Sequence, residues 1–292
     1  MIIYRSILYY AMKNQKKVYL IISIVSLVIV LVALIALGIL LYSYKQARDT
    51  YNELALQAKT SASSGDRDVV LSDDEADAEA AEIIDPVDIP VDFEFLKGEN
   101  QDIIGWIQVD GTQIDYPVLY DTTYNRYYLR HNFKGTNTAY GSIFILGENA
   151  DDFTDFNTVV YGHNMLDRSM FAQLHQFRKQ EFFDSHGQII IYTPDRKLTY
   201  QVFAAYRTDN LNIILNNDFS TEELRTEYIE GIYAQESLAN FKPEYEVTAS
   251  DRIVTLSTCI GNPAFRYVVQ GVLVSDEYGV YTPPQPADED AN

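Results

Sequence analysis

The sequence predicts a mainly β protein: an eight-stranded, closed or nearly closed barrel with helical insertions, preceded by one N-terminal transmembrane helix. Residues 18–42 contain no charged side chain, eight short strand-like segments lie between residues 103 and 274, and only two segments among them have a helical pattern. Many short strands separated by turn residues are typical of a barrel. The 292-residue chain is 47% hydrophobic and 22% charged, a globular composition that excludes a multi-spanning or wholly disordered protein.

Residues 18–42 are the predicted membrane anchor. This segment is rich in Ile, Leu and Val, and at about 1.5 Å per residue it is long enough to cross a hydrocarbon core of about 30 Å. A cleaved signal peptide is the alternative, but its apolar region is only about 7–15 residues long, and no small-residue cleavage site directly follows this run. We therefore expect one uncleaved span.

The charges around this span predict its orientation. Four basic residues precede it, namely Arg5, Lys13, Lys16 and Lys17. Since cytoplasmic flanks carry an excess of Lys and Arg, residues 1–17 are expected in the cytoplasm and the chain after the span outside the cell. The sequence thus predicts a single-pass protein of the cell membrane.

Residues 43–92 are predicted to form a stalk and an acidic linker. Up to about Thr60 the sequence favours helix, without an evident packing face, so the membrane helix is expected to continue. From there to residue 92 acidic and small residues dominate, and such a segment cannot bury enough apolar surface to fold. We expect a solvated tether, with an acidic binding segment as the alternative, and a further acidic tail over residues 282–292.

Residues 93–281 form the predicted globular domain, which is long enough for one substantial core. Its strand-like segments are separated by turn residues such as Asp110-Gly111 and Thr193-Pro194-Asp195. The predicted strands cover residues 103–109, 113–120, 141–146, 157–161, 188–192, 197–206, 252–258 and 266–274.

Two helical insertions interrupt this pattern. Apolar residues recur at helical spacing from Met170 to Phe177, and the simplest role for this face is packing on the barrel. A second helix is predicted from Ser220 to about Ala234, because Glu223 follows Ser220 at the spacing of a capping box. It lies inside a long connection, residues 207–250, and connections of that length often have a function.

The overall charge argues against a nucleic-acid-binding protein, and the cysteine count excludes a disulfide-stabilised one. A formal net charge of −20 makes a nucleic-acid partner improbable, because phosphate binding depends on clustered Lys and Arg. Cys259 is the single cysteine, so an intramolecular disulfide is impossible.

Cys259 is the candidate nucleophile. It closes the alternating run from Ile253 and precedes the turn Gly261-Asn262-Pro263, so it is expected at the end of a strand, on the rim of the barrel. A free cysteine is more often a small buried hydrophobe. A catalytic thiol would also need a base or cation that favours the thiolate and a donor that stabilises the oxyanion.

His163 is the first candidate for the partner of the thiol, because it ends a predicted strand directly after Gly162. His131 is the second candidate, although its aromatic neighbourhood favours a structural role. His175 in the first helical insertion and His186 in a polar loop are expected to be solvated surface residues.

Arg266 is the candidate oxyanion donor. It is the first basic residue after Cys259 and opens the last predicted strand. If residues 252–258 and 266–274 form an antiparallel hairpin, the end of one strand lies beside the start of the next. Cys259 and Arg266 would then share one rim.

Together these residues resemble the signature of the sortases, cysteine transpeptidases on the outer face of Gram-positive bacteria. The motif Thr255-Leu256-Ser257-Thr258-Cys259 followed by Arg266, with Tyr161-Gly162-His163-Asn164 upstream, has the family's order, and the likeness extends from about Phe93 to Val274. The Ser within Thr-Leu-Ser-Thr-Cys, Met165 after Asn164 and the long insertion are most similar to class B.

The resemblance implies a mechanism and partners. Cys259 would attack a C-terminal sorting signal of an exported protein and form a thioacyl-enzyme, His163 would carry the proton, and Arg266 would donate to the carbonyl oxygen. An amine of peptidoglycan or its lipid-linked precursor would then take the acyl group, and neither a metal nor an organic cofactor is needed. Candidate substrate-binding residues are Asn164, Ser257 and Thr258.

Three alternatives stay open at this point. A cysteine peptidase would hydrolyse the same acyl-enzyme, and a pilin-polymerising sortase would pass it to a pilin lysine. A non-catalytic surface module would bind wall polymer or protein through an aromatic-rich face and would leave Cys259 unreactive.

Overall fold

The structure is a computed structural model that describes residues 2–60, 86–123, 126–235, 238–241 and 245–281. Most of the predicted acidic linker, residues 61–85, and the predicted acidic tail, residues 282–292, lie outside the described residues. The chain divides into two compact units, residues 1–50 and residues 51–292.

Helix α1 (Ile2–Thr60) makes up the described part of the first unit and extends into the second. Between residues 18 and 42 its apolar side chains are exposed, so the described part of the chain does not cover them. A helix satisfies its own backbone hydrogen bonds, which is what a segment in lipid requires. The predicted N-terminal apolar helix is thus present, and by length and composition it is a candidate membrane span.

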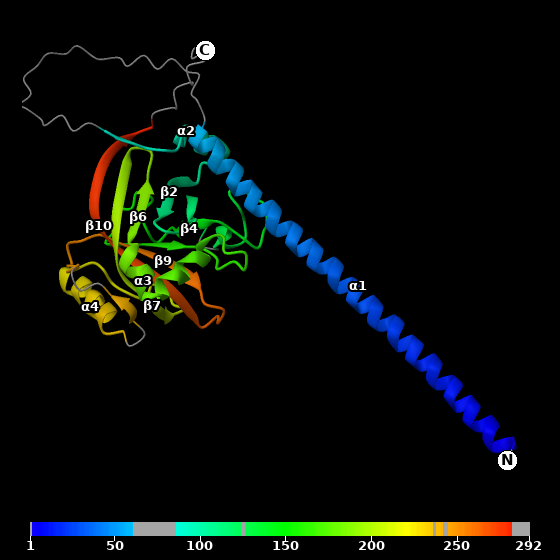
Figure 1. The fold of residues 1–292 in the computed structure, drawn as a ribbon. Helices are drawn as coiled ribbons and strands as arrows, with labels where there is room; N and C mark the ends of the chain where they lie inside the picture. Colours follow the sequence, from blue (N-terminus) through cyan, green and yellow to red (C-terminus); the bar gives the residue numbers. More distant parts are fainter. Residues whose placement is uncertain (1, 61–85, 124–125, 236–237, 242–244, 282–292) are drawn as a thin grey trace, which may run out of the picture. The chain divides into compact units, whose positions relative to one another are not determined.

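Eight strands of the second unit pair in a ring. Figure 1 labels β2, β4, β6, β7, β9 and β10 among them. They are β2 (Ile103–Val109), β3 (Asp115–Asp121), β4 (Ile143–Leu146), β5 (Asn157–Tyr161), β6 (Gln188–Tyr192), β7 (Arg196–Asp209), β9 (Ile253–Cys259) and β10 (Phe265–Val280). The order is β10, β9, β5, β4, β3, β2, β6 and β7, and β7 pairs with β10 to close the ring. The closed eight-stranded barrel predicted from the sequence is therefore confirmed.

Two short strands extend this sheet beyond the ring. Strand β1 (Val87–Asp88) pairs in parallel with the end of β10, and β8 (Leu238–Phe241) pairs with β7. Neither was expected from the sequence, because each is too short to have a periodic pattern.

Helix α1 ends against the barrel. Tyr51, Leu54 and Ala58 are buried, and their spacing places them on one face of the helix. The Tyr51 hydroxyl donates to the Gly141 carbonyl at 2.6 Å, and Lys59 forms an ion pair with Asp115 at 2.5 Å. Burial alone would raise the pKa of Asp115, but hydrogen bonds from Lys59, Trp106 and Gln108 outweigh it and hold the pKa below its usual value. The last turns of α1 are thus part of the globular domain and not a free stalk.

The first predicted insertion is a 3₁₀ helix, η2 (Phe171–Arg178), followed by the short helix α3 (Gln180–Ser185). Phe171, Leu174 and Phe177 are all fully buried and recur every third residue. That spacing gives a continuous apolar face on a helix with three residues per turn. In an α-helix, a continuous apolar face needs apolar residues at spacings of both three and four positions. The predicted helical segment is therefore present, as a 3₁₀ helix.

The second insertion contains helix α4 (Glu222–Tyr233), which begins two residues later than its predicted start at Ser220. Thr221 is the N-cap residue, and its side chain accepts from the Leu224 amide. The predicted capping box at Ser220 is wrong because the Ser220 amide is already bonded to the Asp218 carboxylate in the preceding turn, at 2.8 Å.

Helix α4 packs on the barrel through an apolar cluster and a polar network. Ile229 and Ile232 join a buried cluster with strand residues that include Phe203 and Val268. Next to it, the Tyr228 hydroxyl accepts hydrogen bonds from Asn157 and Gln270, both at 3.0 Å. Buried polar groups of this kind are stable only when they are paired, so they fix one position of the helix.

Two more short helices lie between the strands. Helix α2 (Phe93–Glu99) is capped by the Asp92 carboxylate, which accepts from the amides of Glu94 and Phe95. The 3₁₀ helix η1 (Tyr127–Leu129) lies in the long connection from β3 to β4. This connection borders the candidate site.

Candidate active site

Strands β5, β9 and β10 bring three chain segments to one rim of the barrel. β5 and β9 are parallel, with Tyr161 opposite Ser257, so their carboxyl ends lie at the same rim. β9 and β10 are antiparallel, with Cys259 opposite Arg266. The hairpin geometry expected from the sequence therefore exists, with Cys259 and Arg266 as direct cross-strand neighbours.

One pocket at this rim is lined by His163, Cys259 and Arg266. Each of these three residues is half-buried, so each side chain is shielded from bulk water and still accessible. The structure thus brings the three sequence-predicted residues together from three different elements. The other residues that line the pocket are Arg126, Leu129, Phe144, Leu146, Tyr161, Gly162, Asn210, Leu211, Ser257 and Thr258.

His163 is held by a backbone carbonyl. Its Nε2 donates to the Leu129 carbonyl oxygen at 2.6 Å. The residue before it, Gly162, is buried, and a Cβ there would lie 2.5 Å from Ile143 and 2.6 Å from Phe171. The absence of a side chain at position 162 lets the end of β5 pass close to its neighbours, which places His163 at the pocket.

The Leu129 carbonyl is itself positioned by the connection that contains η1. Gly141 packs against it with a φ of +54°, and a Cβ at this glycine would stand 2.5 Å from the Leu129 oxygen. Tyr51 of α1 donates to the Gly141 carbonyl. His131 lies in the same connection, where its ring stacks on Tyr127 and its Nδ1 bonds the Tyr127 carbonyl at 2.8 Å. These contacts indicate a structural role for His131.

The last backbone hydrogen bond between β5 and β9 runs from the Gly162 amide to the Ser257 carbonyl. Beyond it, side chains connect the two strand ends. The Thr258 hydroxyl donates to the Gly162 carbonyl at 2.8 Å, and Asn164 Nδ2 donates to the Cys259 carbonyl at 3.0 Å. Ser257 and Thr258 are buried, whereas Asn164 is exposed. A substrate-binding role for these three residues stays a prediction. The hydrogen bonds of Thr258 and Asn164 also hold the two strand ends together.

His175 is not the surface residue expected from the sequence. It is half-buried on η2, its Nε2 donates to the Cys259 carbonyl at 2.9 Å, and its ring lies 5.1 Å from the ring of Tyr267. Burial lowers the pKa of His175, the nearby Arg178 guanidinium lowers it further, and the bond to the Cys259 carbonyl opposes both. No local pattern indicates such a contact, because His175 and Cys259 are far apart in sequence.

Arg266 supplies a cation at the rim. Its Nη1 donates to the Phe265 carbonyl at 3.2 Å, and no ion pair within the described residues involves its guanidinium. A guanidinium has five N–H donors in a planar fork, so donors remain for an oxygen that enters the pocket. A thiol, an imidazole and a guanidinium around one pocket are the groups that covalent acyl transfer requires.

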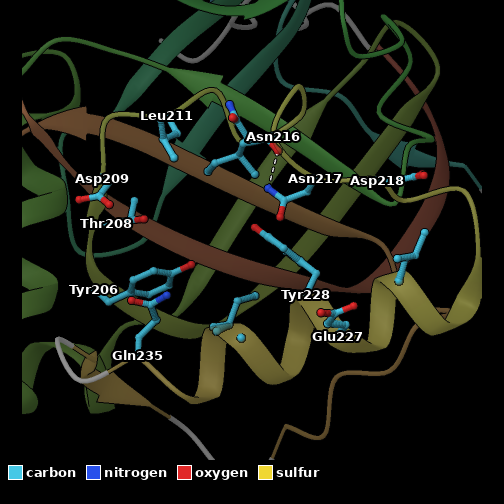
Figure 2. A pocket seen from close by; sticks show the side chains of 14 residues that line it. Tyr206, Thr208, Asp209, Leu211, Asn216, Asn217, Asp218, Glu227, Tyr228 and Gln235 are labelled. Atoms are coloured by element: carbon cyan, nitrogen blue, oxygen red, sulfur yellow. Dashed lines mark hydrogen bonds between the residues drawn. The ribbon is translucent and has the colours of Figure 1, made fainter.

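A second, larger pocket adjoins this one between α4 and the loop that follows β7. Figure 2 shows Tyr206, Glu227 and Tyr228 around it. Leu211 lines both pockets, so the insertion forms one wall of the candidate site. The position of α4, fixed by Tyr228, therefore affects the shape of this wall.

Comparison with known proteins identifies relatives of the chain. A family model for the sortase domain matches residues 107–274. The chain is 34% identical over 183 residues to the sortase B of Listeria monocytogenes, and this alignment covers 62% of the chain and 73% of the relative. Its identity to the sortase B of Staphylococcus aureus is 36% over 167 residues, covering 57% and 67% of the two proteins.

Solved structures give the same result. The sortase B of Bacillus anthracis in complex with AAEK1 is similar with a TM-score of 0.63 and 32% identity, over 80% of this chain and 99% of that one. A Staphylococcus aureus sortase B–substrate complex has a TM-score of 0.63 and 28% identity, again over 80% and 99%. The structural similarity thus extends over most of the chain.

The support of His163 by Leu129 leads to a prediction about Gly141. Gly141→Ala adds a Cβ that the Leu129 carbonyl does not admit, at a φ that disfavours side chains. We expect this variant to lose about 1–3 kcal/mol of unfolding free energy in urea denaturation and to shift the imidazole NMR resonances of His163. Gly98→Ala is the matched control, because nothing lies within 4 Å of its added Cβ. Unchanged stability and an unchanged His163 spectrum in Gly141→Ala would contradict this account.

Proposed function

This chain belongs to the sortase family, and on that premise we propose that it is a membrane-anchored transpeptidase that joins exported proteins to the cell wall. It would cleave a C-terminal sorting signal through a thioacyl-enzyme and transfer the protein to an amine of peptidoglycan or its lipid-linked precursor. The family acts as cysteine transpeptidases, and the two named relatives are sortases B. The observation that carries the proposal is the shared pocket of His163, Cys259 and Arg266.

The first half-reaction is acylation of Cys259. The thiolate sulfur attacks the carbonyl carbon of a Thr in the sorting signal, a C–S bond forms, and the peptide C–N bond breaks. His163, as imidazolium, donates its proton to the leaving amine, which departs with the C-terminal fragment. The hydrogen bond from His163 to the Leu129 carbonyl supports this role, since it keeps the ring at the pocket while the proton moves.

The second half-reaction returns the enzyme to its starting state. The incoming amine attacks the thioester carbon, a new C–N bond forms, and the C–S bond breaks. The amine proton passes to His163, and Cys259 leaves as the thiolate. Water can attack the same thioester, so hydrolysis competes with transfer to the amine.

Arg266 would stabilise both tetrahedral intermediates. Negative charge develops on the carbonyl oxygen in each step, and a guanidinium at hydrogen-bond distance stabilises it more strongly in a shielded pocket than in water. The position of Arg266 directly opposite Cys259 supports this role.

The proposed location is the cell membrane, with the N-terminus in the cytoplasm and the barrel outside. The apolar part of α1 supports an anchor, and the basic residues before it support this orientation. The enzyme would then meet exported proteins and wall precursors on the outer side of the membrane.

The direct test of the proposed function uses the full-length protein, a sorting-signal peptide and an amine nucleophile. Ligated peptide should form, and its yield relative to hydrolysed peptide should rise with amine concentration. The variant Cys259→Ala should form neither product, and mass spectrometry should find the acyl group on Cys259 of the parent. Hydrolysis alone at every amine concentration would identify a peptidase. Transfer to a pilin lysine in preference to a wall amine would identify a pilin-polymerising sortase. An unreactive Cys259 thiol would identify a binding module.

Removal of the Arg266 guanidinium tests its role as the oxyanion donor. Arg266→Ala should lower kcat about 100- to 1,000-fold, with a smaller effect on KM, because the interaction is made in the transition state. Arg207→Ala is the matched control, since Arg207 is an exposed arginine on the adjacent strand β7 that does not line the pocket. Equal rates for the two variants in steady-state cleavage assays would argue against the role.

The orientation is testable in intact cells that carry an N-terminal and a C-terminal epitope tag on the chain. External protease should remove the C-terminal tag and leave the N-terminal tag protected. Permeabilised cells, in which both tags are accessible, serve as the control. Protection of the C-terminal tag in intact cells would reverse the proposed orientation.

A further inference from the structure

Two side chains meet at the backbone carbonyl of Cys259. His175 Nε2 lies 2.9 Å and Asn164 Nδ2 lies 3.0 Å from this oxygen. Both come from the segment that starts at His163 and ends with η2. The carbonyl of the proposed nucleophile is therefore held by the segment that also carries its proposed proton carrier.

This segment is firmly attached to the barrel. Phe171, Leu174 and Phe177 are fully buried, and the Phe171 amide donates to the His163 carbonyl at 2.9 Å. The donor ring of His175 therefore belongs to an element whose own position is fixed by packing. A hydrogen bond from such an element can hold a strand end in one orientation.

The protonation state of His175 agrees with a donor role. Nδ1 is buried and has no hydrogen-bond partner among the described residues. Burial lowers the pKa of His175. A neutral ring with its proton on Nε2 donates to the Cys259 carbonyl and leaves Nδ1 unprotonated. In a protonated ring, Nδ1 would carry a buried N–H that has no acceptor.

The orientation of this carbonyl also fixes the next amide. A peptide unit is planar and trans, so the Cys259 carbonyl and the Ile260 N–H point in opposite directions. Donors on the carbonyl side therefore determine where the Ile260 N–H points. The amide that follows a nucleophile is well placed to bind the oxyanion of an acyl-transfer intermediate.

We propose that His175 and Asn164 are positioning residues that hold the Cys259–Ile260 peptide plane, so that the Ile260 N–H donates to the oxyanion together with Arg266. This inference rests on the proposed acyl-transfer function. Neither side chain touches the substrate in this role. Their effect reaches the reaction through the peptide plane.

The test compares acyl transfer with a reaction of the same thiol that forms no oxyanion. In the full-length protein, His175→Phe keeps an aromatic ring beside Tyr267 and removes the donor, whereas His175→Gln retains an N–H donor. Asn164→Ala removes the other donor at an exposed position, where loss of the fold is not expected. His186→Phe is the control, because His186 stacks on Phe182 and does not line the pocket.

The expected result separates the two reactions. His175→Phe and Asn164→Ala should each lower kcat for thioacyl formation about 10- to 100-fold with KM within about 3-fold, since they misplace one oxyanion donor and do not remove it. Alkylation of Cys259 by iodoacetamide should stay within about 3-fold of the parent, because this displacement does not depend on an oxyanion donor. His175→Gln should recover most of the lost kcat, and His186→Phe should match the parent.

Any one of three kinetic results would overturn the inference: an unchanged kcat in both His175→Phe and Asn164→Ala, an equal loss of alkylation and acylation, or a His175→Gln variant no better than His175→Phe. The backbone amide resonance of Ile260 gives a readout that does not depend on activity. It should move in His175→Phe and stay in place in His186→Phe, and an unmoved resonance would also overturn the inference. A parent protein that cleaves no sorting peptide would refute the proposed function instead, while the Ile260 resonance would still report on the peptide plane.

Discussion

The candidate site depends on one arrangement of backbone hydrogen bonds, the pairing of β9 with β5 on one side and β10 on the other. The parallel pairing places His163 at the same rim as Cys259, and the antiparallel pairing places Arg266 directly opposite Cys259. A slip of one residue in either register would turn the side chains of the shifted strand to the opposite face. The chemistry proposed for this rim therefore depends on strand register.

Contacts around the rim maintain this register. Beyond the last backbone bond, Thr258 and Asn164 connect the ends of β5 and β9, and His175 joins them from η2. Further along the same strands, the Tyr228 hydroxyl connects α4 to β5 and β10 through paired amide side chains. The insertion that forms a wall of the pocket is thus attached to the strands that carry the proposed catalytic residues, so wall and reacting groups have a common support.

Much of this architecture could be predicted from the sequence. The features that were missed depend on contacts between residues far apart in the chain, which leave no local pattern. Strand ends marked by turn residues identified Cys259, His163 and Arg266, because those signals are local. The role of His175 depends on a contact between residues distant in sequence, which no periodicity indicates. The burial of Tyr51 and Leu54 has helical spacing, but that pattern is too short to distinguish from a solvated stalk without the barrel beside it. The apolar spacing of η2 indicated a helix, and its 3₁₀ form is seen only in the structure.

In the proposed mechanism, one rim holds the nucleophile, the proton carrier and the oxyanion donor for a single acyl group. The most direct measurement is a crystal structure of the enzyme with a sorting-signal analogue bound covalently to Cys259. The acyl carbonyl oxygen should lie about 3 Å from the Arg266 guanidinium, with the His163 imidazole beside the scissile position. An acyl group outside this pocket, with Arg266 still directed only to the Phe265 carbonyl, would contradict this mechanism.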